Sequence, residues 1–426
     1  MLRNKQQKQS ILVFVLTITA LLLSTKRLHA LTFSIEPKVV LYLSLGVVVL
    51  TYLLIVKRIR VDTRLVLVWM VYLLALAVPL LQRGGNSGDW KMYLVYVVVF
   101  AAVLFVPTIL SNRAYVLQFV DVLLLCSTAL ALVGIGIYFR VGPAIDIGMV
   151  FQPHETFFPD RLRPRRARGI YVSSSAYGGW LLLTVFLGIA RAISSAGNQK
   201  FRYIPMSIII LLGIFLTNSR GVVGALLIGL LVFTTILLLT GTRNVHLWTF
   251  TKAVTILLPG GFLLSSSGLL PGFNVIDRFI GILHGDHLHS VSTRVRIWRD
   301  GVEIFLSNPL FGVGLNRFGE HVSVGTRFAA NPHNILIQWI AETGLVSTLL
   351  ICAAILIAIR PAVATVLTQT ESFEYYYSVA VIAATAALFA ENMVGSSLRY
   401  ASPLFLFWVL LATTRALHTS DGDTPI

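Results

Sequence analysis

The sequence predicts an all-α protein that crosses a membrane many times, with about twelve transmembrane helices and a helical periplasmic loop domain. Two observations predict this class. Of the 426 residues, 56% are hydrophobic and only 12% are charged, and a soluble chain of this size could not bury so much apolar surface. Apolar stretches of roughly 18 or more residues also recur, the length that a helix needs to cross about 30 Å of hydrocarbon.

The apolar stretches can be assigned to spans one by one. The predicted spans lie near residues 10–25, 38–56, 64–82, 92–110, 114–139, 171–192, 203–218, 221–240, 246–265, 334–359, 375–393 and 398–416. The first stretch follows a basic start, as a signal peptide would, but it lacks a convincing small-residue cleavage site. We therefore expect it to remain as the first helix.

Basic residues in the short connectors predict the orientation. With the N-terminus in the cytoplasm, "KRIRVDTR", "SNRA", "SSAGNQKFR", "GTRN" and the tract from Arg360 all face inward, and nearly all carry the Lys or Arg that cytoplasmic loops favour. The C-terminus then also lies inside. Both long loops, 140–170 and 266–332, face outward, toward the periplasm if the membrane is a Gram-negative inner membrane.

Three parts follow from this topology. Residues 1–265 hold the first spans and an arginine-rich loop near 140–170, residues 266–333 form the periplasmic loop domain, and residues 334–426 hold the last spans. Within the loop domain, "RVRIWRDGVEIFLSNP" predicts an amphipathic helix at the membrane interface or over the bundle. Its expected apolar face comprises Trp298, Val302, Phe305 and Leu306.

The net charge of +16 comes mostly from cytoplasmic Lys and Arg that orient the helices. An arginine cluster in the first outer loop opposes that bias. Its members are Arg161, Arg163, Arg165, Arg166 and Arg168. Guanidinium groups match phosphate with paired planar donors, so the cluster indicates an anion site. A solvated loop near anionic lipid headgroups is the alternative, and nucleic acid is not expected as a partner on this surface.

The candidate catalytic group is His333, which directly follows Pro332 at the start of an apolar span. It either begins the helix or acts as a general base. Arg220 lies in "LTNSRGVVGALL", a tight break between two spans on the outer side, where it either binds an anion or snorkels to the interface. Arg294 and Arg168 lie on the same side as these two residues.

An imidazole among fixed cations favours its neutral form, which can accept a proton from a hydroxyl group. The arginines can stabilise a departing diphosphate. These groups suit metal-independent transfer of a sugar from a polyprenyl diphosphate donor to a hydroxyl acceptor.

Other polar residues carry weaker hypotheses. We expect a flexible polar loop, rather than a metal site, at "HGDHLH", and a structural ion pair between Glu391 and Arg399. No helical spacing organises His154 and Glu155. The sequence contains no P-loop, dinucleotide fingerprint, serine-nucleophile motif or pair of CxxC motifs.

The pieces "STRVRIWRDGVEIFLSNPLFGVGLNRF", "PHNILIQWIAETGLVS", "NSRG" and "RARGIYVSSSAYGG" resemble the O-antigen ligase and O-antigen polymerase superfamily, which includes bacterial O-linked oligosaccharyltransferases. The resemblance covers roughly residues 160–350. It implies an inner-membrane glycosyltransferase that acts on undecaprenyl-diphosphate-linked glycan at the periplasmic face, without a cofactor.

The resemblance also implies roles for particular residues. It makes His333 the catalytic histidine and Arg220 a ligand of the donor diphosphate. The further substrate-binding residues expected from it are Arg168, Arg294, Arg166, Arg296 and Asn334. Gly344 fits the family's helix-start signature, whereas Ser347 stands where glycine is common, a departure expected to affect packing.

Within the superfamily, a ligase transfers the finished polysaccharide to lipid A–core oligosaccharide, a polymerase to another lipid-linked repeat, and an oligosaccharyltransferase to a protein hydroxyl. Arg168 and Gly179 show the arginine–glycine spacing of polymerases once, and no second match is found. The chain also ends soon after its last span, whereas oligosaccharyltransferases usually carry a larger C-terminal outer domain. By elimination we favour the ligase. A transporter or flippase of lipid-linked sugars is the alternative from another class, but no internal repeat or midplane charge pairs support it.

Overall fold

The computed structural model describes residues 12–13, 15–18, 62–85, 87–151, 166–241, 288–323, 331–368 and 371–418. The regular structure in these residues is helical, which confirms the all-α class. The helices are α3 (Thr63–Arg83), α4 (Ser87–Ile109), α5 (Arg113–Tyr138), α6 (Gly142–Phe151), α8 (Ser174–Ser194), α9 (Lys200–Leu216), α10 (Arg220–Leu239), α13 (Leu288–Ser307), α14 (Ile335–Thr368), α15 (Phe373–Asn392) and α16 (Ala401–His418). Three short 3₁₀ turns accompany them, namely η2 (Gly197–Gln199), η3 (Phe318–Glu320) and η4 (Ser397–Arg399).

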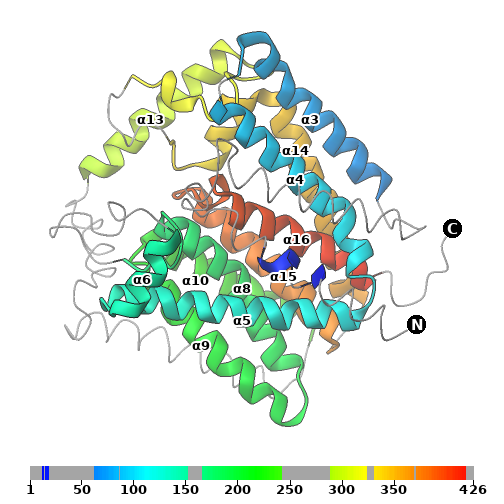
Figure 1. Ribbon diagram of the computed structural model, residues 1–426. Coiled ribbons are helices and arrows are strands. Elements are labelled where there is room, and N and C mark those ends of the chain that lie inside the picture. Colours follow the sequence, from blue (N-terminus) through cyan, green and yellow to red (C-terminus); the bar gives the residue numbers. More distant parts are fainter. Residues whose placement is uncertain are drawn as a thin grey trace.

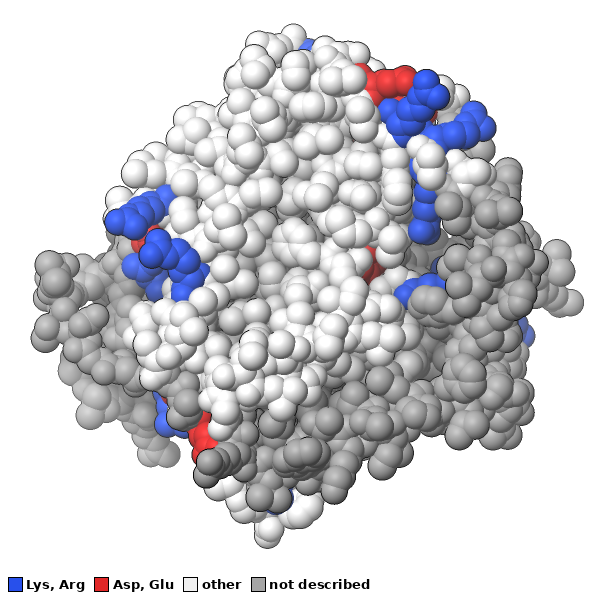
Figure 2. Space-filling model, turned by 180° about the vertical axis from the view of Figure 1, so that it is seen from behind, with Lys and Arg blue, Asp and Glu red and all other residues white. Residues whose placement is uncertain are grey.

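Among the described residues, 9 helices are long and apolar enough to cross a membrane. They are α3, α4, α5, α8, α9, α10, α14, α15 and α16, and each coincides with a predicted span. The predicted spans at 38–56 and 246–265, and most of the one at 10–25, lie outside the described residues. Figure 2 shows a broad face made mostly of uncharged side chains, with most of the charged ones at its margins, as expected for a surface that faces lipid.

The helices form two groups, and two further helices, α15 and α16, contact both groups (Figure 1). Helices α3, α4 and α14 lie together, and α5, α8, α9 and α10 form the second group, with α15 and α16 between them. Helix α8 is almost entirely enclosed by other helices, since 94% of its most apolar 18-residue stretch is buried. Helix α13 is not a span and packs against α14 at one end of the bundle.

Helix ends predicted to lie on the same side of the membrane contact one another. On the side predicted to be cytoplasmic, Arg113 at the start of α5 pairs with Glu374 at the start of α15 at 3.0 Å. On the other side, Arg317 pairs with Asp89 at the start of α4 at 2.9 Å. Arg317 lies in the loop between α13 and α14, which is predicted to face outward and is called the outer loop below. These contacts agree with the predicted alternation of helix direction.

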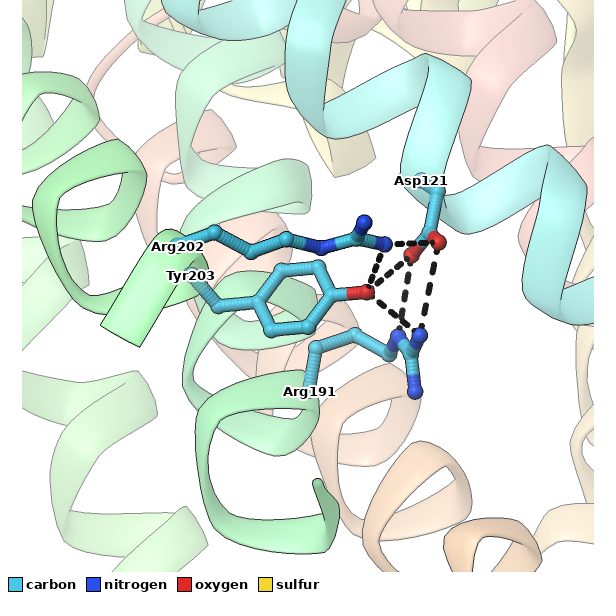
Figure 3. Close-up of polar contacts among 4 residues, drawn as sticks. All are labelled: Asp121, Arg191, Arg202 and Tyr203. Carbon is cyan, nitrogen blue, oxygen red and sulfur yellow. Dashed lines mark hydrogen bonds and ion pairs between the residues drawn. The ribbon is translucent and has the colours of Figure 1, made fainter. Parts of the chain in front are cut away.

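A compact polar cluster joins three helices at the side predicted to be cytoplasmic (Figure 3). This Asp121 cluster consists of Asp121 on α5, Arg191 on α8, and Arg202 and Tyr203 on α9. Arg191 Nε and Arg202 Nη2 lie 3.0 and 2.5 Å from the Asp121 carboxylate. The Tyr203 hydroxyl donates to Asp121 Oδ1 at 2.8 Å, and the Arg191 guanidinium lies 4.6 Å from the Tyr203 ring centre. The Asp121 carboxylate therefore binds both guanidinium groups and the tyrosine hydroxyl, and these bonds tie the three helices together.

Candidate active site at the outer end of the bundle

Helix α14 is interrupted at Gly344, where φ is 72° and ψ is −179°. At the break, backbone carbonyls before Gly344 and backbone amides after it lose their helical hydrogen bonds. Within a membrane such groups need other hydrogen-bond partners. The outer loop supplies four hydrogen bonds: from the amides of Val313 and Gly314 to the carbonyls of Ala341 and Glu342 (3.0 and 2.8 Å), and from the amides of Leu345 and Val346 to the carbonyls of Pro309 and Leu310 (2.8 and 3.3 Å). The loop thus replaces the missing helical bonds and is fixed to α14.

Two glycines permit this close approach of loop and helix. A β-carbon at Gly344 would lie 2.3 Å from the Leu310 carbonyl oxygen, and one at Gly312 would lie 2.4 Å from the carbonyl carbon of Glu342. Both glycines also have positive φ angles, 72° and 69°, which glycine adopts without steric cost. The motifs "FGVG" and "ETG" are therefore the two halves of one backbone junction.

Side chains hold the same loop from α3, α4 and α14. Arg83 at the end of α3 donates to the Val313 carbonyl at 3.2 Å, and Arg317 is bonded to the fully buried Asp89 at 2.9 Å. The buried carboxylate of Glu342 accepts a hydrogen bond from the Phe318 amide at 3.4 Å. This loop is therefore a rigid support for the residues that follow it.

Asn334, and not His333, caps helix α14. Asn334 Oδ1 accepts hydrogen bonds from the amides of Leu336 and Ile337 at 3.1 and 3.2 Å, as a capping side chain does. His333 precedes this cap with φ 51°, in the left-handed region, and its amide donates to Asn331 Oδ1 at 2.9 Å. The helix-start role considered for His333 thus belongs to its neighbour, and the imidazole lies outside the helix.

Helix α13 is anchored beside the histidine. The indole Nε1 of Trp298 donates to the Pro332 carbonyl at 2.8 Å, one residue before His333. Gly301 brings α13 close to α14, since a β-carbon there would lie 2.4 Å from Ile337 Cγ2. The segment that leads into His333 is consequently held between the two helices.

The buried face of α13 differs from the expected one. Val302 and Leu306 are 43% and 67% exposed, whereas Ile297 and Ile304 are buried. The two isoleucines pack in a small cluster with residues of the outer loop and α14, namely Val313, Phe318 and Ala341. The face that packs on α14 is therefore the isoleucine side, because the folded-back loop supplies apolar partners there. The predicted place of the Trp298–Leu306 face at the membrane interface stays a prediction.

His333 is half-buried and lies in a positive field. Burial, and then the charges of Arg294 and Arg399, lower the pKa of His333 from 6.5 to about 4. The imidazole is therefore neutral at pH 7 and able to accept a proton. Burial also lowers the pKa of Arg294, which lies one helical turn before Trp298.

The two predicted arginines of α13 lie on different sides of the helix. Arg296 is two residues beyond Arg294, which places it roughly 200° around the axis, and it is exposed. The charges that act on His333 come from Arg294 and Arg399. The structure thus brings Arg294, and not Arg296, to the histidine.

Three of the predicted site residues, Arg166, Arg168 and Arg220, belong to backbone segments that lie side by side in the fold. Helix α9 ends at Leu216 and α10 begins at Arg220, which confirms the tight break. The amide of Ala167 donates to the Leu216 carbonyl at 2.7 Å, so the two arginines that flank Ala167 are held beside this break. All three arginines are half-buried.

The connection between α15 and α16, residues 393–400, lies between these arginines and the histidine. At one end, a β-carbon on Gly221 would lie 3.1 Å from Val394 Cγ2, so the start of α10 touches the connection. At the other end, Arg399 Nη2 donates to Asn316 Oδ1 of the outer loop at 2.8 Å. One short segment therefore links the Arg220 region to the His333 region.

The hydrogen bonds of Glu391 and Arg399 lead to different parts of the protein, in contrast to the ion pair predicted between them. The buried Glu391 carboxylate accepts hydrogen bonds from the amide and hydroxyl of Ser397 at 3.2 and 2.5 Å. Arg399 extends to Asn316 instead. Sequence reasoning missed Arg399 as a site residue, because Asn316 is 83 positions away and no local spacing connects them.

Several sequence hypotheses fall outside the described residues. They concern Arg161, Arg163, Arg165, His154, Glu155, His284, Asp286 and His287, and the side chain of His289. Among the residues that are described, no group of three or more His, Cys, Asp or Glu side chains is arranged to hold a metal ion.

The fold and site define a polytopic helical membrane protein with a histidine and arginines gathered at one end of its bundle. The family model of O-antigen ligase matches residues 205–352, a segment that contains Arg220, Arg294 and His333. This match supports the resemblance of the chain to the O-antigen ligase superfamily. Arg166 and Arg168 lie before the matched segment. No curated protein matches the chain.

Proposed function

We propose that this protein is an O-antigen ligase, a glycosyltransferase that moves O-antigen polysaccharide from undecaprenyl diphosphate to lipid A–core oligosaccharide. The reaction would take place on the periplasmic face of the bacterial inner membrane. The family match supports a glycosyltransferase-like enzyme, and the histidine and arginines at the outer end of the bundle supply the groups that this reaction needs.

In the proposed reaction, His333 takes the proton of an acceptor hydroxyl as its oxygen bonds to the anomeric carbon of the donor sugar. The bond between that carbon and the diphosphate oxygen breaks, and undecaprenyl diphosphate leaves with the electron pair. His333 suits the role because its imidazole is neutral at pH 7 and lies outside the helix that Asn334 caps. This placement is the observation on which the proposal rests.

The arginines would stabilise the leaving diphosphate. Arg220 at the first position of α10, with Arg166 and Arg168 beside it, provides guanidinium groups that bind phosphate oxygens in pairs. Arg294 provides positive charge on the histidine side. Fixed cations of this kind stabilise charge that develops in the transition state, so transfer should persist in the presence of a chelator.

The test is glycan transfer by purified variants in liposomes that contain the lipid-linked donor and lipid A–core. His333→Ala should lose roughly 10²–10⁴-fold in rate, the usual contribution of a positioned base, at unchanged expression and unfolding temperature. His321→Ala is the matched control, because His321 is an exposed histidine of the same outer loop. A folded His333→Ala protein with near-normal transfer would exclude the base role.

A second variant tests the arginine role. Arg220→Lys keeps the charge but loses the bidentate fork, so transfer should stay well below the wild-type rate. The products of the same assay distinguish the alternatives. Longer lipid-linked glycan without lipid A–core would indicate a polymerase, a glycosylated protein an oligosaccharyltransferase, and donor movement without transfer a flippase.

A further inference from the structure

Buried side-chain hydrogen bonds hold the connection between α15 and α16 in place. Glu391 and Asn392, at the end of α15, are 1% and 0% exposed, and both bond to the η4 turn. Asn392 Nδ2 donates to Ser397 Oγ at 2.8 Å, and Asn392 Oδ1 accepts from the Leu398 amide at 2.9 Å. Burying a carboxyl group and an amide costs free energy unless they are bonded, and here those bonds hold one turn.

The same turn is also fixed from α8. A β-carbon at Gly179 would lie 2.4 Å from Ser397 Cβ, so only glycine lets α8 approach η4 this closely. Ser397 is fully buried. The turn is thus held by α15 on one side and α8 on another, and its last residue, Arg399, leaves it toward the site.

Arg399 reaches three parts of the site. It donates to Asn316 of the outer loop at 2.8 Å, and its charge acts on both His333 and the buried Glu342. The other end of its connection touches the start of α10 through Val394 and Gly221, next to Arg220. Arg399 therefore belongs to a segment that contacts both the outer loop and the start of α10.

We propose that Arg399 is a phosphate-binding residue of this site, positioned by the buried pair of Glu391 and Asn392. The inference rests on the proposed function, because the ligand is the diphosphate of a lipid-linked donor. A guanidinium group has five N–H donors in a planar fork, a geometry that matches phosphate oxygens. Glu391 and Asn392 are positioning residues and do not touch the substrate.

The first experiment compares Arg399→Gln with Arg299→Gln in the transfer assay across pH. Both variants remove one positive charge from the side predicted to face outward, but Arg299 is exposed and its ion pair is with Glu303 on the same helix. We expect Arg399→Gln to lose roughly 100-fold in kcat/KM, as is usual when one donor to a developing anion is lost, and Arg299→Gln to stay within about twofold of wild type.

The pH profile separates a site role from a structural one. The charged groups that act on His333 are Arg294 from α13 and Arg399 from η4. Removal of Arg399 should therefore move the acid limb of kcat/KM to higher pH, whereas a turn that is merely loosened would lower the rate without moving the limb. An unchanged rate and profile in folded Arg399→Gln would overturn the proposal.

A double-mutant cycle tests the positioning role. Glu391→Gln should lower transfer on the wild-type background and add little on the Arg399→Gln background, because residues that act through one group are not additive. Additive losses would mean that Glu391 acts independently of Arg399.

Ligand binding separates failure of this proposal from failure of the proposed function. Binding of undecaprenyl diphosphate to the purified protein should weaken in Arg399→Gln and not in Arg299→Gln, with undecaprenyl monophosphate as the weaker ligand. If wild type transfers no glycan but this difference persists, the reaction is wrong and the phosphate site stands. Equal binding by both variants would reject Arg399 as a ligand residue.

Discussion

The two ends of the bundle use arginine in opposite ways. In the Asp121 cluster, two guanidinium groups and a tyrosine hydroxyl converge on one carboxylate that joins α5, α8 and α9. At the other end, burial and then the charges of Arg294 and Arg399 lower the pKa of a histidine and favour its neutral form. In the first arrangement the positive charges converge on a carboxylate, whereas the second concentrates positive charge around a proton acceptor.

This contrast distinguishes structural from chemical use of the same side chain. A guanidinium group bonded to a half-buried carboxylate stabilises packing, and breaking that pair leaves charge uncompensated. Cations gathered near an imidazole raise the energy of its protonated form, which does nothing for packing. Such an arrangement suits the binding of an anion, as the proposed function requires.

The largest expected difference is that mutation of the Asp121 cluster lowers stability, whereas mutation of His333 lowers the rate of transfer. Asp121→Asn should lower the unfolding temperature in detergent, by a free energy on the order of 1–3 kcal/mol, because two arginines lose a charged acceptor. The rate of transfer per folded molecule should remain within a few-fold of wild type. His333→Ala should show the reverse pattern, and a large rate loss in folded Asp121→Asn would mean that the two ends are coupled.

Much of this architecture could be predicted, because hydropathy reports directly on burial in lipid. The spans, the break at Arg220 and the position of His333 before α14 were all predictable from local sequence. The break in α14 was not, because the apolar run continues through Gly344 and its partners come from residues 309–314. Arg399 and Asn316 were likewise beyond reach, since only the fold brings them together.

The junction between the outer loop and α14 gives the next largest effect. Gly344→Ala adds a β-carbon that meets the Leu310 carbonyl, on a backbone with positive φ. Left-handed backbone alone costs about 1–2 kcal/mol in a non-glycine residue, and the clash adds to it. We expect a marked loss of thermal stability and of transfer.

Gly197→Ala is the matched control for this substitution. Gly197 also has a positive φ angle, 56°, but nothing lies within 4 Å of a β-carbon there. It should therefore show the conformational cost alone. Equal destabilisation of the two variants would mean that backbone strain, and not the junction, explains the effect of Gly344→Ala.

The pH dependence should be smaller but diagnostic. The pKa of His333 is lowered to about 4 in the free protein, so kcat/KM should stay flat through neutral pH and fall only as pH drops toward that value. A bound diphosphate neutralises the surrounding cations, which raises the pKa of the imidazole in the complex. The acid limb of kcat should therefore lie at higher pH than that of kcat/KM, since the two report the complex and the free enzyme respectively.

Arg294→Gln sharpens this test. Removal of one of the two cations should raise the pKa of His333 in the free protein and move the kcat/KM limb to higher pH. Arg296→Gln provides the control from the opposite side of the same helix, and its limb should not move. Equal shifts in the two variants would show that the general positive field, and not the placement of Arg294, sets the pKa.

The smallest effect concerns the cap beside the histidine. Asn334→Ala removes the acceptor for the amides of Leu336 and Ile337 and should cost about 1 kcal/mol of stability. Asn334→Ser keeps a capping oxygen and should retain that stability in thermal unfolding. If Asn334 also binds substrate through its remaining amide group, the serine variant should lose a few-fold in transfer, the value of one neutral hydrogen bond. An unchanged rate in the stable serine variant would restrict Asn334 to capping and leave His333 as the group at this helix start that carries the chemistry.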